Sequence, residues 1–291
     1  MKKLFILAFF TALLSLAFFS ASFLFSMPLS KTFSFDTNNL DNIEHFFNED
    51  LPTSIEENFT PTNSDTVPSR NYTVLIDAGH GGTDPGSIGY KTKVHEDILN
   101  LKMSKLLKQK LESAGINVVM TRESDNALIE GAGRKWKRKE MEARRELIKK
   151  TRPNMVISLH QNSYTNHSLR GAQVFYDKKS EISKLIAESI QEQFKLNLDK
   201  SIKAPSPGDY FMLKCSSAPS VIVECGFLSN EEDEKLLLSP EYQEKIINSI
   251  YRGIVNFFQI KWYFYILTLN AIKIAFLFCN QKNINQNHFL L

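Results

Sequence analysis

The stretch YTVLIDAGHGGTDPG, residues 72–86, joins a short apolar run to a glycine-rich turn that contains a histidine. The run from Tyr72 to Ile76 is typical of a buried β-strand, and it ends at Asp77. Glycines on both sides of His80 allow the backbone to turn sharply and to bring the imidazole close to a ligand. The stretch therefore predicts a functional histidine just after a strand, with an incidental histidine in a turn as the alternative.

Apolar strands and helices alternate along the chain after this turn. Leucine and methionine recur at helical spacing in residues 96–114, and Gly115 is placed to end that helix. Further strands are expected at 116–120, 155–159, 171–176 and 220–223, and further helices at 137–150, 181–198 and 240–258. This alternation predicts a single α/β domain whose sheet has helices on both faces.

Polar residues directly follow three of the expected strands. Asp77–His80 ends the first strand, His160 follows residues 155–159, and Glu224 follows residues 220–223. In an open α/β sheet, ligands bind beyond the C-terminal edge of the strands. These three positions therefore form one candidate pocket.

His80, Glu96 and His160 together supply the donor set of a catalytic zinc site. Taken singly, Glu96 is a carboxylate in the first turn of a helix, where the helix dipole explains it. His160 alone is equally well a hydrogen-bonded residue at the rim of a sheet. Two imidazoles and one carboxylate leave a fourth position for water, which is the arrangement of a catalytic zinc shell. Zinc in such a shell lowers the pKa of its water to about 7 and polarises a carbonyl.

Glu224 lies in PSVIVECGFLSN, residues 219–230, with apolar residues on both sides. A carboxylate in apolar surroundings is costly unless it is paired or functional. Beside a zinc site, it is placed to act as a general base and then to protonate the leaving nitrogen. A structural ion pair is the alternative interpretation.

The two ends of the chain differ from the domain between them. Residues 1–27 begin with Met-Lys-Lys and continue as an apolar run that is close to the length that spans a bilayer. We interpret them as an uncleaved membrane anchor in preference to a cleaved signal peptide, and expect the rest of the chain outside the cytoplasmic membrane. Residues 28–70 are expected to be a flexible tether and residues 71–258 the folded domain. The role of the tail, residues 259–291, stays open between membrane association, partner binding and no function.

Charge and cysteine content narrow the classes of function. The net charge is only +3, so no nucleic-acid partner is indicated. Three cysteines without regular spacing indicate neither a zinc ribbon nor a disulfide scaffold, and Cys225 is expected to be a buried thiol. Residues 134–152 are dense in Lys and Arg around Trp136, which is typical of a solvated helix face. A contact surface for an anionic polymer or a partner is the alternative there.

Four ordered motifs resemble those of the zinc-dependent N-acetylmuramoyl-L-alanine amidases. The match runs in order from about Tyr72 to Phe258, over nearly the whole expected domain. The motifs are DAGHGG at 77–82, ED at 96–97, ISLHQN at 157–162 and VECGFLSN at 223–230.

The resemblance implies a fold, a reaction and a set of site residues. The fold is a twisted, mostly parallel sheet between helices. The reaction is hydrolysis of the amide between N-acetylmuramic acid and L-alanine in peptidoglycan. His80, Glu96 and His160 match the family's Zn²⁺ ligands, and Glu224 matches its catalytic glutamate.

Within that family, the N-terminal segment and the sequence of residues 224–230 are most similar to those of the spore-cortex amidases. The resemblance implies a role in forming muramic-δ-lactam, which germination enzymes recognise, in the forespore or spore cortex. Residues 128–150 are too short for the autoinhibitory insertion of some division amidases, so regulation is expected from elsewhere, such as a partner protein that stabilises zinc binding.

One motif departs from the family pattern. Many members carry Arg-x-x-x-Ala-Asn before the third strand, where this chain reads MEARREL at 141–147. Arg144 or Arg145 takes the place of that arginine, and the sequence does not choose between them.

Two other functions fit the same residues. A zinc peptidase that cuts within the stem peptide would use the same ligand set. A non-catalytic wall-binding module would be favoured if Glu224 or a ligand were missing, but all four residues are present.

Overall fold

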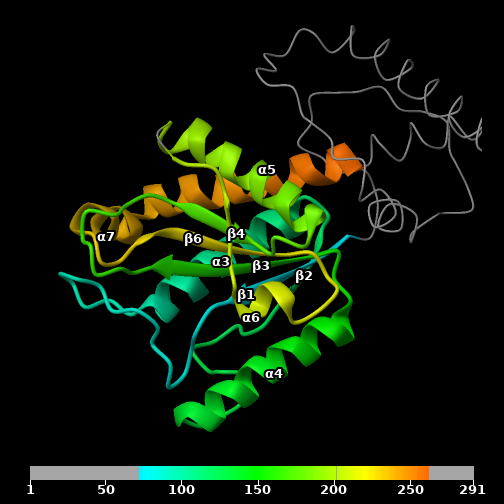
Figure 1. Ribbon diagram of the computed structural model, residues 1–291, viewed down its shortest axis with the longest axis horizontal. Helices are drawn as coiled ribbons and strands as arrows, with labels where there is room; N and C mark the ends of the chain where they lie inside the picture. The colour runs from blue at the N-terminus through cyan, green and yellow to red at the C-terminus, as the bar shows by residue number, and fades with distance from the viewer. Residues whose placement is uncertain (1–71, 201, 262–291) are drawn as a thin grey trace, which may run out of the picture. The chain divides into compact units, whose positions relative to one another are not determined.

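A six-stranded sheet forms the centre of residues 72–200 and 202–261, the part of the chain that the computed structural model describes (Figure 1). Its strands are β1 (Thr73–Ala78), β2 (Asn117–Met120), β3 (Met155–Asn162), β4 (Gln173–Tyr176), β5 (Ser206–Pro207) and β6 (Ser220–Phe227). The helices around it are α3 (Glu96–Ser113), α4 (Gly133–Thr151), α5 (Glu181–Asn197), α6 (Phe211–Lys214), α7 (Glu231–Leu238) and a helix over residues 240–261.

The strands lie in the order β2-β1-β3-β6-β4-β5. β2, β1, β3 and β6 run parallel to one another, whereas β4 is antiparallel to β6. Parallel neighbours end at the same edge of a sheet, so the C-terminal ends of β1, β3 and β6 lie side by side. The predicted fold, an α/β domain with a mostly parallel sheet, is confirmed.

Different helices cover the two faces of the sheet. On one face, Leu75, Val156 and Ile222 pack with Ile148 of α4 and with α6. On the other face, α3 buries a stripe of leucine and methionine at helical spacing. Side chains alternate between the faces along a strand, and adjacent residues at the end of β3 therefore diverge. The Gln161 side chain donates a hydrogen bond to Asn100 of α3, while His160 faces a cavity on the α4 side.

Three strands run further than the sequence predicted. β1 continues through Asp77, β3 through His160 and β6 through Glu224 before each ends. Backbone hydrogen bonds between strands do not depend on apolar side chains, so β3 and β6 stay paired where their polar residues begin. His160 lies opposite Glu224 in this pairing. The candidate site residues on β3 and β6 are therefore held by the sheet itself and not by loops.

The other differences concern short elements and one helix start. α4 begins at Gly133, four residues before its expected start at Lys137. β5, α6 and α7 were not predicted, because two, four and eight residues are too few to show a clear hydrophobic period.

Several predictions about the ends of the chain lie outside the described residues. They concern the anchor at 1–27, the tether at 28–70 and the tail at 259–291, of which only residues 259–261 are described, as the end of the helix over residues 240–261. Among residues 72–200 and 202–261, no helix is both long and apolar enough to cross a membrane. Cys225 is free and fully buried, as predicted, and Cys215 is also free.

Candidate metal centre and active site

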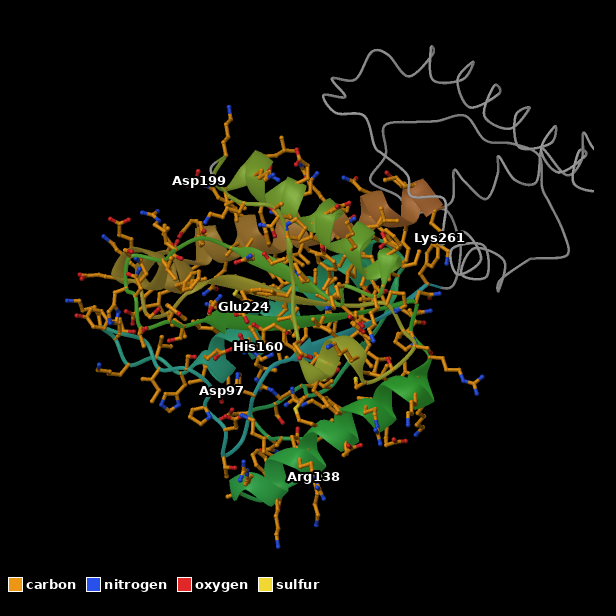
Figure 2. The ribbon with its side chains drawn as sticks, in the orientation of Figure 1. Asp97, Arg138, His160, Asp199, Glu224 and Lys261 are labelled. Atoms are coloured by element: carbon orange, nitrogen blue, oxygen red, sulfur yellow. The ribbon has the colours of Figure 1, made fainter. Side chains whose placement is uncertain are left out.

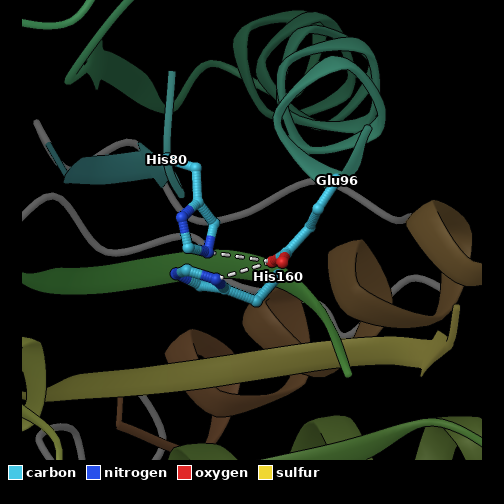
Figure 3. A group of neighbouring side chains, drawn as sticks. All are labelled: His80, Glu96 and His160. Carbon is cyan, nitrogen blue, oxygen red and sulfur yellow. Dashed lines mark hydrogen bonds and ion pairs between the residues drawn. The ribbon is translucent and has the colours of Figure 1, made fainter. Parts of the chain in front are cut away.

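His80, Glu96 and His160 meet at the C-terminal edge of the sheet (Figure 3). His80 comes from the turn after β1, Glu96 from the first turn of α3, and His160 from β3. The Oε1 atom of Glu96 lies 3.3 Å from Nε2 of His80 and 2.9 Å from Nδ1 of His160. The three candidate ligand atoms all lie within 4.8 Å of one another. Residues up to 80 positions apart in sequence thus form one cluster that could hold a metal ion.

Two glycines make room for this cluster. A Cβ atom on Gly79 would lie 2.3 Å from Nε2 of His160, so the imidazole packs directly over the Gly79 backbone. A Cβ atom on Gly86 would lie 2.6 Å from Oε2 of Glu96, and Gly86 has a φ of +67°. The close approach expected of the glycine-rich turn is therefore found. His80 itself has a φ of 62°, a conformation that residues with a Cβ atom rarely adopt.

Asp84 holds the second nitrogen of the His80 ring. Its Oδ2 atom lies 2.9 Å from Nδ1 of His80 and 3.0 Å from Nζ of Lys137 on α4. A carboxylate behind a metal-binding histidine fixes the orientation of its ring. Burial alone would lower the pKa of His80, but hydrogen bonds to Asp84 and Glu96 raise it to about 9. Sequence analysis missed Asp84, although a carboxylate four residues after His80 in the same turn was a usable signal.

Glu96 is held in place by several donors. Its Oε2 accepts from the backbone N–H of Ser87 at 2.8 Å, and its Oε1 accepts from the backbone N–H of Gln161 at 3.1 Å. Asn100 donates to the same Oε1 from the next turn of α3. Burial favours the neutral acid, but hydrogen bonds from His160 and His80 outweigh it and hold the pKa of Glu96 below its usual range. Glu96 is therefore ionised, as a metal ligand must be.

The donor set fits zinc. Two imidazole nitrogens and one ionised carboxylate oxygen are the protein ligands of many catalytic zinc sites, which leave one position open. The carboxylate of Asp84 behind His80 matches the usual surroundings of such a ligand. The residues His80, Glu96 and His160 would therefore hold Zn²⁺.

Glu224 lies beside this cluster on the neighbouring strand (Figure 2). Its register partner in β3 is His160. Burial raises the pKa of Glu224 to about 7, although the nearby His160 opposes the shift. Among the described residues, its buried Oε2 atom has no hydrogen-bond partner. The structural ion pair considered for this residue is therefore not found in the described part of the chain.

Of the two arginines that the sequence leaves open, Arg145 is partly exposed on α4 and Arg144 is buried. Its Nη1 donates to Oδ1 of buried Asp77 at 2.8 Å, and its Nη2 donates to the carbonyl oxygen of His80 at 2.8 Å. Glu140 accepts from the same guanidinium one turn back along α4. Burial alone would raise the pKa of Asp77, but Arg144 and the hydroxyl of Ser158 hold it below its usual value. Arg144 thus fixes the backbone that carries His80.

A cavity of about 170 Å³ opens beside the cluster, on the face of the sheet that α4 and α6 cover. His80 and His160 form part of its wall. Helix α4 contributes Trp136, Lys137 and Met141, and the region of α6 contributes Tyr210, Phe211 and Met212. The metal cluster is therefore reached from a cavity with a largely apolar lining.

The remaining histidines lie apart from the cluster or outside the described residues. His95 is exposed just before α3. His167 is hydrogen-bonded to the carbonyl oxygen of Ser229 and packs on the ring of Tyr90, 4.7 Å between centroids. His45 and His288 are not among the described residues.

Comparison with known proteins identifies the family. The family model described as N-acetylmuramoyl-L-alanine amidase matches residues 74–256 of this chain. The chain belongs to this amidase family. The amidase is 32% identical, over 197 residues, to the germination-specific N-acetylmuramoyl-L-alanine amidase of Bacillus subtilis, covering 66% of this chain and 82% of that protein.

Solved structures show the same relationship. The amidase superposes on the CwlD amidase of Clostridioides difficile, solved in complex with the GerS lipoprotein, with a TM-score of 0.63 and 37% identity. That match covers 65% of this chain and 100% of the other. An N-acetylmuramoyl-L-alanine amidase from Clostridium difficile 630 matches with a TM-score of 0.59 and 27% identity, over 66% of this chain and 98% of that one. The chain is accordingly an N-acetylmuramoyl-L-alanine amidase, a hydrolase of peptidoglycan.

Proposed function

We propose that this amidase is zinc-dependent, with His80, Glu96 and His160 as the metal ligands and Glu224 as the catalytic acid and base. The observation that carries the proposal is the convergence of three ligand atoms within 4.8 Å. The buried Glu224 on the adjacent strand, whose Oε2 atom has no hydrogen-bond partner among the described residues, supports the second part. Zn²⁺ bound in the cluster would supply Lewis-acid chemistry, polarising the scissile carbonyl and lowering the pKa of the attacking water.

Side chains of the protein supply proton transfer and hold His80 in position. Glu224 takes a proton from the attacking water and then delivers it to the nitrogen of L-alanine as the amide breaks. Its Oε2 atom, which accepts no hydrogen bond within the described part of the chain, is available for this transfer. Asp84 holds the His80 ring in the orientation that binding requires, and Arg144 holds the His80 backbone.

Digestion of purified peptidoglycan by the full chain tests this proposal. Mass spectrometry should find intact stem peptides with free L-alanine amino termini, and cleavage should stop on chelation and return with added Zn²⁺. Cuts between amino acids of the stem would instead identify a zinc peptidase. Zinc binding without any turnover would identify a wall-binding module.

We further propose that the amidase acts in spore-cortex maturation and helps to form muramic-δ-lactam. The proposal is supported by 32% identity to a germination-specific amidase and 37% identity to the CwlD amidase. Deleting the gene should remove muramic-δ-lactam from the cortex of purified spores. Cortex with an unchanged muramic-δ-lactam content would contradict this role.

We also propose an extracytoplasmic location and a regulatory protein partner. The location rests on the sequence of residues 1–27, and the partner on the CwlD amidase having been solved with a lipoprotein. An alkaline phosphatase fusion after residue 70 should be active, and an inactive fusion would contradict export. Tagged amidase isolated from sporulating cells should have a molar mass above that of the single chain, bound to a second protein. A monomeric mass would contradict the partner.

A further inference from the structure

The scissile amide has two sides, and a cavity on the α4 and α6 face of the sheet adjoins His80 and His160. One side of the bond is a glycan strand and the other is a peptide. At about 170 Å³, the cavity is smaller than the roughly 300–1,000 Å³ of ordinary ligand pockets. Such a space fits one or two amino-acid residues better than a sugar chain.

The lining of the cavity suits a short peptide. Met141, Met212 and Ile222 supply apolar surface next to His160. Tyr210 and Phe211, at the start of α6, also line the cavity and keep 43% and 40% of their surface exposed. These side chains can cover the apolar part of a bound peptide without first breaking the core.

Besides the two histidines, the lining contains two basic residues, and only one of them is available to a ligand. The guanidinium of Arg144 is buried and donates to Asp77, Glu140 and the His80 carbonyl. Lys137 is 56% exposed, and its ammonium lies 3.0 Å from Asp84, which also binds His80. The cavity is also lined by Asp77 and Glu140, which are paired with Arg144, and by Asp84. An ammonium has three donors, so Lys137 keeps donors for a further anion beside Asp84.

We propose that the cavity is the subsite for the peptide stem and that Lys137 pairs with the stem carboxylate nearest to the scissile amide. This inference rests on the proposed function, because it places the bond at the His80–Glu96–His160 cluster. A half-exposed ion pair adds little affinity. Its effect is to select and orient stems that carry the free carboxylate.

Kinetics on a matched pair of substrates test the proposal. Both are glycan fragments with the same stem, whose second residue carries its α-carboxyl group either free or as a carboxamide. Lys137→Gln should raise KM for the free carboxylate about three- to fivefold, the size of an exposed ion pair, and leave kcat within about twofold. KM for the carboxamide should not change, and Lys137→Arg should restore the wild-type preference.

Arg138 provides the matched control on the same helix. It is exposed, and Figure 2 shows its side chain pointing away from the sheet. Arg138→Gln removes the same charge and should change neither KM. Equal losses on both substrates in Lys137→Gln would show that Lys137 acts only through Asp84, and would overturn the proposal. Equal effects of the two variants would overturn it as well, because they indicate only general attraction.

A binding measurement separates this inference from the proposed function. Calorimetry with the Glu224→Gln variant should show tighter binding of the free-carboxylate fragment than of the carboxamide, and adding Lys137→Gln should remove that difference. Equal binding of both fragments by the Glu224→Gln variant would overturn the inference. Failure of the wild-type enzyme to cleave either fragment would count against the proposed function and not against the subsite.

Discussion

Two groups of ionisable side chains lie at the same edge of the sheet and differ in how well they are paired. In the first, which we call the arginine network, Asp77 accepts hydrogen bonds from Thr121, Ser158 and Arg144, and Arg144 also binds Glu140. In the second, the metal cluster with Glu224, two histidines share one oxygen of Glu96, and the buried Oε2 of Glu224 has no partner among the described residues.

The difference separates structural charge from reactive charge. A fully paired buried network is rigid and specifies one arrangement, whereas an unpaired buried group is costly and persists where it serves function. The two groups are joined at His80, whose carbonyl oxygen binds Arg144 and whose ring belongs to the metal cluster. The paired network thus holds the backbone from which the reactive group is built.

The largest effect on stability is expected from breaking the arginine network. Asp77→Asn leaves the Arg144 charge buried without its main partner, so the free energy of unfolding should fall by about 3–5 kcal/mol. Denaturant titration at pH 7 measures this. The pKa of Asp77 is lowered in the folded state, so its contribution is present above the unfolded pKa and is lost as the pH falls. The gap between wild type and variant should therefore narrow in acid, and a gap that widened would contradict the assignment.

A smaller effect on stability is expected from Asp84, which joins His80 of the metal cluster to the exposed Lys137. Asp84→Asn removes the carboxylate behind His80, so zinc affinity should fall about 10- to 100-fold. Competition with a fluorescent zinc chelator measures the affinity, and the free energy of unfolding without metal should change much less than in Asp77→Asn. Unchanged zinc affinity would show that Asp84 does not support the ligand.

The smallest effect is expected at Arg145, the neighbour of Arg144. Its side chain is 35% exposed and pairs with Glu142 and Glu146 on the surface of α4. Arg145→Gln should change the free energy of unfolding by about 0.5 kcal/mol or less, whereas Arg144→Gln should destabilise the fold as Asp77→Asn does. Equal losses from the two variants would show that burial of Arg144 is not what distinguishes them.

The sequence was sufficient for the fold, because it depends on strong local patterns, whereas the cluster of His80, Glu96 and His160 was predicted only by combining weak signals with a family resemblance. Strand and helix alternation predicted the parallel sheet, and strand ends predicted that His80, His160 and Glu224 lie at one edge. The contacts of Asp84 with Lys137, and of Arg144 with Asp77, join residues 53 and 67 positions apart. No hydrophobic period encodes such pairs, so the choice between Arg144 and Arg145 needed the structure.

The cavity also could not be predicted from the sequence. Its second wall is α6, a four-residue helix that is too short for a periodic pattern. The sequence favours one solvated face for the basic residues of α4, with a contact surface as the alternative. The structure places Lys137 at the cavity and Arg138 on the outer side of the helix. Only the rotation of α4 about its axis, set by packing of Ile148 on the sheet, distinguishes the two.

The most direct test of the account is the zinc content and turnover of Glu224→Gln measured on the same purified sample. The variant keeps the ligands His80, Glu96 and His160, so it should bind one zinc per chain. Its free energy of unfolding should lie within about 1 kcal/mol of the wild-type value. Its kcat on peptidoglycan should fall about 10²- to 10⁴-fold, the range expected for loss of a general acid and base. Normal turnover would contradict the catalytic role of Glu224, and loss of zinc would show that Glu224 belongs to the metal site instead.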